Sequence, residues 1–317
     1  MKKNLMLTCL FTGIISLLLL CLQRYDHTLS VKEAQFNKEG KIKFTHVFIG
    51  SSDVATSILP SKFDSEMFNR GCHSRSFNFS VVNITPIVLY RILKFLKNSK
   101  NIDSNTVVYI GQIRKQSKPL MPFVELREYM NFDLDYFLFS IKSASSIDLK
   151  IKFFYENVLL FVKKLFLTKS NIFAIQPKHE RDSFAKLLKY EKSLTNGEIP
   201  YTKIFNSTWK VNEESFNKGL KDFNDAWNDS ITYSHKNNMF YEKLKDEFSS
   251  LTIKNFIGVT YFMNEIVESG YGSAFTIHPK NFSTIFEPQY WQDNYHLNQK
   301  GAEIFSGKIA SILCDQK

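Results

Sequence analysis

The stretch Lys43-Phe-Thr-His-Val-Phe-Ile-Gly-Ser-Ser52 indicates both the fold and a candidate site. A compact apolar run that ends at Gly50 is typical of a buried strand followed by a tight turn. In an open parallel sheet, catalytic and binding side chains gather just beyond the carboxyl ends of the strands. Ser51 and Ser52 are therefore candidates for chemistry, although glycine and serine also form such turns for structural reasons alone. A phosphate-binding loop is excluded, because the chain lacks the G-x-x-x-x-G-K-[ST] pattern.

Short apolar runs alternate with amphipathic stretches along the rest of the chain. This alternation is typical of a parallel α/β sheet, in which helices connect successive strands and cover them. Residues from 120 to 235 are less regular, and we expect them to form a helical insertion. The sequence predicts further strands at 76–82, 106–110, 171–176 and 253–259, and helices at 86–96, 239–248 and 301–313.

Within the insertion, residues 149–167 form a strongly apolar run. The run also carries Glu156, Lys163 and Lys164, which argues against a second membrane span. We expect a helix that packs on the sheet or on a cap. The alternative is a basic amphipathic helix that rests on a membrane surface.

The N-terminal sequence predicts the cellular compartment of the protein. Lys2 and Lys3 precede an uncharged apolar run, and its 18 residues from 5 to 22 are just enough to cross a bilayer core of roughly 30 Å. The positive-inside rule keeps the two lysines cytoplasmic and exports the rest of the chain. We therefore expect a single-pass protein of the cell membrane, with its C-terminal domain in the periplasm or outside the cell.

The expected organisation is a signal anchor over residues 1–23, a polar tether over 24–43 and one α/β domain over 44–317. A cleaved signal peptide is an alternative, but no small-x-small cleavage site follows the apolar run. A lipoprotein signal that ends at Cys21 is another, and the bulky Leu20 speaks against it.

The charge of the chain indicates which class of partner to expect. The formal charge is +10, from 41 Lys and Arg against 31 Asp and Glu, but the lysines are scattered and no nucleic-acid motif accompanies them. We therefore expect anionic lipid or an anionic envelope polymer as the partner rather than nucleic acid.

Cys72 and Cys314 lie in the exported part, where they could form a disulfide. No Cys/His spacing indicates zinc, and we expect neither a metal nor an organic cofactor.

The stretch Trp291-Gln-Asp-Asn-Tyr-His-Leu-Asn-Gln-Lys-Gly-Ala302 places Asp293 three residues before His296. A carboxylate at this spacing can hold one imidazole nitrogen and leave the other free to act as a base. Such a pair indicates hydrolytic or acyl-transfer chemistry only if a nucleophile lies nearby. Ser52 can be that nucleophile if the turn after residue 49 and this motif meet at the same edge of the sheet.

An apolar strand that leads into Gly-Ser-Ser, together with D-x-x-H-L-N-x-x-G-A before a terminal helix, resembles the SGNH (GDSL-like) hydrolase superfamily, and most of all its membrane-anchored envelope members. The resemblance covers about residues 44 to 315, with its specific content in the two end motifs. It implies a three-layer α/β/α, flavodoxin-like sheet of about five parallel strands. It also implies that Ser52 is the nucleophile, with His296 as the base and Asp293 as its partner.

The middle of the chain departs from that family's pattern. Its third block carries G-x-N-D after a strand, whereas this chain reads Tyr109-Ile-Gly-Gln-Ile-Arg114. At its second block, Ser80 or Asn83 stands where a glycine is expected. Besides the Ser52 N–H, the candidate oxyanion-hole and substrate-binding residues are Gly50, Asn78, Asn83 and Gln112.

Two hypotheses follow from these observations. The first is a serine esterase or O-acyltransferase that acts on acyl esters, acetyl above all, of a cell-envelope polysaccharide through an acyl-enzyme. The second is a non-catalytic, membrane-anchored protein of the same fold that binds glycan or a partner integral-membrane acyltransferase. The missing G-x-N-D block favours the second hypothesis, and the Ser52, His296 and Asp293 set favours the first.

Overall fold

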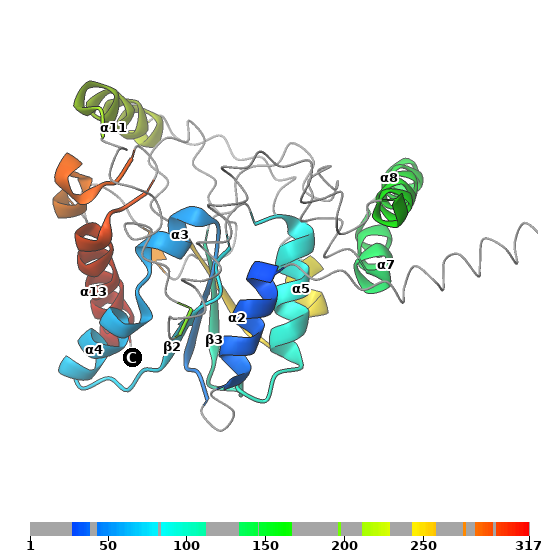
Figure 1. The fold of residues 1–317 in the computed structure, drawn as a ribbon, viewed down its shortest axis with the longest axis horizontal. Coiled ribbons are helices and arrows are strands. Elements are labelled where there is room, and N and C mark those ends of the chain that lie inside the picture. The colour runs from blue at the N-terminus through cyan, green and yellow to red at the C-terminus, as the bar shows by residue number, and fades with distance from the viewer. Residues whose placement is uncertain are drawn as a thin grey trace, which may run out of the picture.

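The computed structural model describes residues 27–38, 43–81, 84–111, 133–144, 146–166, 196–197, 211–228, 243–257, 275–276, 283–293 and 296–316. These residues form an α/β fold around one parallel sheet (Figure 1). The strands are β1 (His46–Ile49), β2 (Ser76–Asn78), β3 (Val107–Gly111), β4 (Thr252–Ile257) and β5 (Phe275–Thr276).

The strand order is β2-β1-β3-β4-β5, and every neighbouring pair is parallel. The predicted parallel sheet is therefore confirmed. Its order reverses between β1 and β3, and in doubly wound sheets this switch point is where ligands bind, outside the carboxyl ends of the strands. The strand predicted at 76–82 is shorter than expected, but Phe79 N and Val81 N continue its pairing by donating to Phe48 O and Gly50 O.

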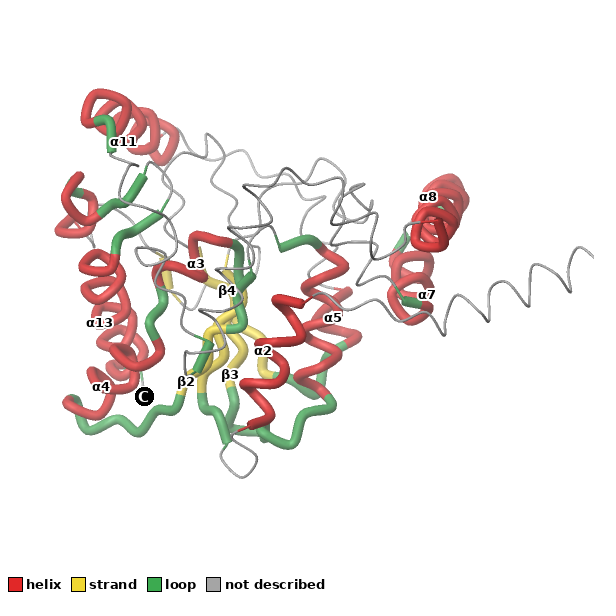
Figure 2. Tube along the Cα trace, viewed as in Figure 1, coloured by secondary structure: helices red, strands yellow, loops and turns green. Residues whose placement is uncertain are grey.

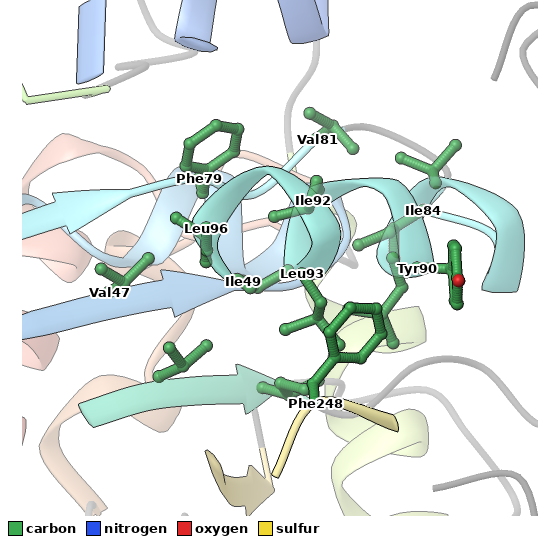
Figure 3. Packing of buried hydrophobic residues seen from close by; sticks show 14 of the residues in the cluster. Val47, Ile49, Phe79, Val81, Ile84, Tyr90, Ile92, Leu93, Leu96 and Phe248 are labelled. Carbon is green, nitrogen blue, oxygen red and sulfur yellow. The ribbon is translucent and has the colours of Figure 1, made fainter. Parts of the chain in front are cut away.

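Alternate residues of the strands build two separate cores, one on each face of the sheet. On one face, Val47 and Ile49 of β1 pack against α2 (His27–Lys38) and α5 (Pro86–Lys97). Figure 3 shows Leu93 and Leu96 of α5 in this packing. Thr85 caps α5, because its side chain accepts from Val88 N and leads the chain into the helix.

The opposite face is covered by α4 (Pro60–Asn69) and α13 (Gln299–Asp315), which lie against each other (Figure 2). Phe48 and Tyr109 point to this side and stack with ring centroids 5.3 Å apart. Helices on both faces give the three layers that a parallel sheet with buried strands requires.

The tether expected over 24–43 is wrong for residues 27–38, which form α2 inside the folded domain. Leu29, Lys32 and Phe36 are fully buried, and Phe36 stacks on Phe44 just before β1. The segment looks polar because a lysine occupies one of its inward positions. Lys32 is accommodated by two backbone carbonyls from distant parts of the chain, which its sequence neighbourhood does not indicate.

The described elements between β3 and β4 are helices. They are α7 (Leu134–Ser143), α8 (Ile147–Phe166) and α11 (Glu213–Asn228), in the region expected to form an insertion. Residues 243–247 are also helical, within the helix predicted at 239–248. The strand predicted at 171–176 and the expected anchor at 1–23 lie outside the described residues. Within the described part of the chain, no helix is long and apolar enough to cross a membrane.

A disulfide joins Cys72, just after α4, to Cys314 in the last turn of α13. The two cysteines are 242 residues apart in sequence. The bond therefore links the C-terminal helix covalently to the region that follows β1, across the face of the sheet that carries the candidate site.

Candidate active site

Ser52 begins the short helix α3 (Ser52–Ser57), which starts shortly after β1 ends. Ala55 N donates to Ser51 O at 2.9 Å and closes the first helical turn. Gly50 permits this tight connection, because a Cβ at that position would lie 2.3 Å from a Val54 methyl carbon. The turn after β1 therefore places the Ser52 side chain at the carboxyl edge of the sheet. Gly50 has a steric role here, and it offers no side-chain donor.

Asp293 and His296 lie in a tight loop between Trp291 and α13. Trp291 and Leu297 form an antiparallel bridge across it, and Gln292 N donates to His296 O at 2.9 Å. One Asp293 carboxylate oxygen accepts from the backbone N–H of His296 at 2.8 Å. Asp293 thus fixes the backbone of the loop as well as the imidazole ring.

The three predicted catalytic side chains lie in one hydrogen-bonded row. His296 Nδ1 lies 2.8 and 3.0 Å from the two carboxylate oxygens of Asp293, and His296 Nε2 lies 2.9 Å from Ser52 Oγ. A carboxylate can only accept, so Nδ1 carries the proton and Nε2 is left to accept from the serine hydroxyl. The side chains of His296 and Asp293 are 19% and 16% exposed, so the row is partly shielded from water but still accessible.

The residues that follow His296 hold it in place rather than take part in chemistry. Leu297 is buried in the core between α13 and the sheet. Asn298 caps α13, since its side-chain oxygen accepts from Gly301 N at 3.0 Å. Gly301 packs so tightly that a Cβ there would lie 2.2 Å from Tyr290 O. The Leu-Asn-x-x-Gly part of the motif is therefore a capping device that aims the histidine.

Asn78 was one of several candidates for a side-chain oxyanion donor, and in the structure its side chain is engaged elsewhere. Its side chain is fully buried and serves α3 instead: Nδ2 donates to Ile58 O at 2.8 Å and to Val54 O at 3.2 Å, while Oδ1 accepts from Ser80 N at 3.0 Å. Asn78 is thus a positioning residue that holds α3, the helix that begins at Ser52, against the end of β2.

Two further groups fix α3 and β2, and sequence reasoning missed both. Ser306 of α13 donates to Ser57 O at 3.1 Å and accepts from Leu59 N at 2.8 Å, which fixes the C-terminal end of α3. The buried Lys32 ammonium donates to Asn78 O at 2.8 Å and to Gly197 O at 3.0 Å. Neither residue has a local sequence signal, since each bonds to backbone groups that only the tertiary fold brings close.

Tyr109 lies beneath this part of the structure, on β3. Burial raises the pKa of its phenol to about 12, so the ring stays neutral at physiological pH. It stacks on Phe48, a residue of β1 that lies shortly before Ser52 in the sequence. The layer under the turn that carries Ser52 is therefore aromatic and uncharged.

Asn83 and Gln112, the other expected oxyanion candidates, lie outside the described residues. Among the residues that are described, no group of three His, Cys, Asp or Glu side chains could hold a metal ion. The arrangement can perform nucleophilic chemistry through a hydroxyl activated by an imidazole. No family model, curated protein or solved structure matches this chain.

Proposed function

We propose that this protein is a serine esterase or O-acyltransferase that works through an acyl-enzyme. The observation that carries the proposal is the row in which Ser52 Oγ lies 2.9 Å from His296 Nε2, with Asp293 on the other ring nitrogen. That distance falls within the range a general base needs to take a proton from its nucleophile. The order of the three residues in space is the one required for serine catalysis, whatever the fold.

In the proposed reaction, His296 Nε2 takes the hydroxyl proton while Ser52 Oγ attacks the ester carbonyl carbon. The tetrahedral intermediate collapses, the C–O bond to the leaving alcohol breaks, and His296 returns the proton to that alcohol. Water or a sugar hydroxyl then gives its proton to His296 and attacks the acyl carbon. The bond from that carbon to Ser52 Oγ breaks, and His296 returns the proton to Oγ, which releases the acyl group and restores Ser52. Asp293 stabilises the imidazolium in both halves of the cycle.

The backbone N–H of Ser52 is the proposed first oxyanion donor. As the first residue of α3, its N–H has no partner within the helix. A side chain from Asn83 or Gln112 is the proposed second donor, since Asn78 is committed to α3. Removal of one oxyanion donor typically costs about 10²–10³ in rate, so the second donor decides how fast the enzyme is.

The resemblance to membrane-anchored SGNH (GDSL-like) hydrolases supports the choice of substrate. The strand order β2-β1-β3-β4-β5 is the flavodoxin-like order that this resemblance implies. The apolar run at 5–22 is the proposed anchor, which would hold the domain outside the cytoplasmic membrane. An acylated polymer of the envelope, most simply an O-acetylated polysaccharide, is the proposed substrate.

A second candidate function is a non-catalytic protein that binds glycan or a partner integral-membrane acyltransferase. The observation that favours it is that the Asn78 side chain bonds to α3 and to Ser80 N, so this candidate oxyanion donor is already engaged. Binding of the acetylated polymer without any release of acetate would support this candidate.

The test compares acetate release from O-acetylated polysaccharide by the wild type, Ser52→Ala and Ser51→Ala. Ser51 is the matched control, because it is a serine in the same turn that lies outside the hydrogen-bonded row. We expect the Ser52 variant to lose release and the Ser51 variant to keep it. Equal activity in all three proteins would contradict the proposal. Transfer of acetyl to added oligosaccharide, measured in the same reactions, distinguishes a transferase from a hydrolase.

A further inference from the structure

The open edge of β2 is closed near its carboxyl end by groups from two distant parts of the chain. β2 is the edge strand of the sheet, and Asn78 is its last residue. The next N–H, that of Phe79, donates to Phe48 O of β1, so the N–H and C=O of Asn78 point the other way, toward the open edge. There Asn78 N donates to Asn196 O at 3.0 Å, and Asn78 O accepts from Lys32 Nζ at 2.8 Å. Both edge-facing groups of Asn78 are therefore bonded.

Asn196 and Gly197 are the part of the helical insertion that reaches this edge. Both have left-handed backbone angles, with φ of 57° and 73°, and an Asn-Gly pair in that conformation is typical of a tight turn. Gly197 is buried and lies so close to β2 that a Cβ would be 2.2 Å from Asn78 O. Glycine is therefore required at this position by space as well as by conformation.

Lys32 of α2 joins this turn to the strand. Its side chain is fully buried, and its ammonium also donates to Gly197 O at 3.0 Å. A buried ammonium is costly unless it is bonded, so these carbonyls fix where it lies. The ammonium in turn fixes the carbonyls of Asn78 and Gly197 relative to each other. We call Lys32, Asn196 and Gly197 the β2 clasp.

Asn78 carries the effect of the β2 clasp to the other side of the sheet. Figure 1 shows α2 on one side of β2, and α4 and α13 on the other. Val54 and Ile58 of α3 pack in the core on the α13 side. The Asn78 side chain donates to Ile58 O at 2.8 Å and to Val54 O at 3.2 Å. Because α3 begins at Ser52, a continuous set of bonds leads from the β2 clasp to the helix that carries Ser52.

We propose that the β2 clasp positions Ser52 for reaction, because it holds Asn78 and, through Asn78, α3. Its residues lie outside the hydrogen-bonded row of Ser52, His296 and Asp293, so they act as positioning residues. Two of them belong to the insertion, and Ser52 is therefore fully positioned only when the turn is docked on β2. A shift of about 1 Å at reacting groups can cost about 10²-fold in rate. The effect on rate rests on the proposed function, whereas the effect on α3 does not.

The first test compares Gly197→Ala with Gly71→Ala in the full-length protein. Both glycines have positive φ, 73° and 77°, so both changes strain the backbone, but a Cβ at Gly71 would meet no atom of the described residues within 4 Å. Hydrogen exchange reports on α3, where Ala55 N and Ile58 N bond to the preceding turn. We expect Gly197→Ala to speed exchange in α3 by about tenfold or more and Gly71→Ala to leave it unchanged. Equal exchange in α3 for both variants would overturn the proposal.

The rate of fluorophosphonate labelling at Ser52 tests the effect on chemistry. We expect Gly197→Ala and Lys32→Met to lower this rate by about tenfold to a hundredfold, and Gly71→Ala to keep it. Rates that stay unchanged beside a labelled wild type would refute the proposal and leave the proposed function standing. If the wild type is not labelled, the proposed function fails, and the exchange of α3 still decides for or against the β2 clasp.

A double-mutant cycle separates positioning from a general loss of stability. Asn78→Ala keeps the backbone groups that bond to the β2 clasp but removes the side chain that reaches α3. In that background, Lys32→Met should still lower the urea midpoint, yet it should change the labelling rate of the folded protein by less than about twofold. An equal fall in labelling rate in both backgrounds would show that Lys32 does not act through Asn78, which contradicts the proposal.

Discussion

At the scale of single residues, Asp293 performs two tasks with one carboxylate. It accepts from His296 Nδ1 and also from the backbone N–H of His296, so it sets both the proton position and the loop geometry. The hydrogen bond from the Ser52 hydroxyl depends on that proton position, because His296 Nε2 can accept it only while Nδ1 carries the proton. The acid–base character of the site therefore rests on Asp293.

Asp293→Asn should abolish most activity while the protein stays folded. An asparagine can donate to Nδ1, which shifts the ring proton to Nε2 and removes the base; in serine proteases the equivalent change lowers kcat by about 10⁴. Acetate release measured beside the denaturation midpoint checks this. Retention of more than about a tenth of wild-type activity would show that His296 does not work through Asp293.

Asn78→Ala should destabilise the domain and misplace Ser52. The change leaves buried carbonyls of α3 without their donor, which typically costs about 1–3 kcal/mol. Asn98→Ala is the control, since it removes a comparable bond to Lys94 O at an exposed position. Urea unfolding measures the stability of both variants. Loss at Asn78 no larger than at Asn98 would mean that α3 is held by other contacts.

At the scale of elements, the sequence predicted helices and strands correctly where the buried apolar residues repeat with the period of that element. The predicted helix at 86–96 is α5 to within a residue, because its apolar residues repeat at helical spacing and Thr85 with Pro86 marks its start. The strands before and after it were located by their short apolar runs. Helix α2 was missed, since Lys32 stands on its inward side and is stabilised by carbonyls 46 and 165 residues away.

In the candidate site, too, some residues could be predicted from the sequence and others could not. Ser52, His296 and Asp293 could be predicted, because the chemistry requires those residue types and two local motifs carry them. The role of Asn78 could not be predicted, because its bonds to α3 exist only once that helix folds back onto β2. Long-range bonds to backbone carbonyls leave no pattern in a single sequence.

The start of α13 provides a test of how His296 is aimed. Gly301→Ala would place a Cβ 2.2 Å from Tyr290 O, a backbone atom that cannot easily move, and should cost about 1–3 kcal/mol together with activity. Gly307→Ala is the matched control on the same helix. Its Cβ would meet only flexible side chains, at 3.9 and 4.0 Å, so it should be neutral or stabilise by about 0.5–1 kcal/mol. Thermal unfolding compares the two, and equal effects would contradict the close approach at Gly301.

At the scale of the whole molecule, the site is assembled from the two ends of the domain. Ser52 follows the first strand, and His296 precedes the last helix, 244 residues later. Cys72 and Cys314 join the same two regions covalently. The contact between α4 and α13, the bridging Ser306 and the disulfide all hold these ends together on one face of the sheet.

Removal of the disulfide should weaken the fold without changing the chemistry. A bond that closes so long a loop restricts the unfolded chain, and its loss typically costs about 2–5 kcal/mol. We expect the double variant Cys72→Ser, Cys314→Ser to unfold at lower urea concentration and to keep its activity at low temperature. An unchanged midpoint would mean that the bond does not contribute in solution, and a loss of activity in the folded state would place it nearer the site than the structure does.

The central claim is that Ser52 is a nucleophile activated by His296. A fluorophosphonate, which reacts with serines activated in this way, tests it most directly when the modified residue is located by peptide mass. The account predicts one adduct, on Ser52, that is absent from Ser52→Ala and His296→Ala and present in Ser51→Ala. An absence of labelling in the folded wild-type protein, or an adduct on Ser51 in place of Ser52, would contradict it.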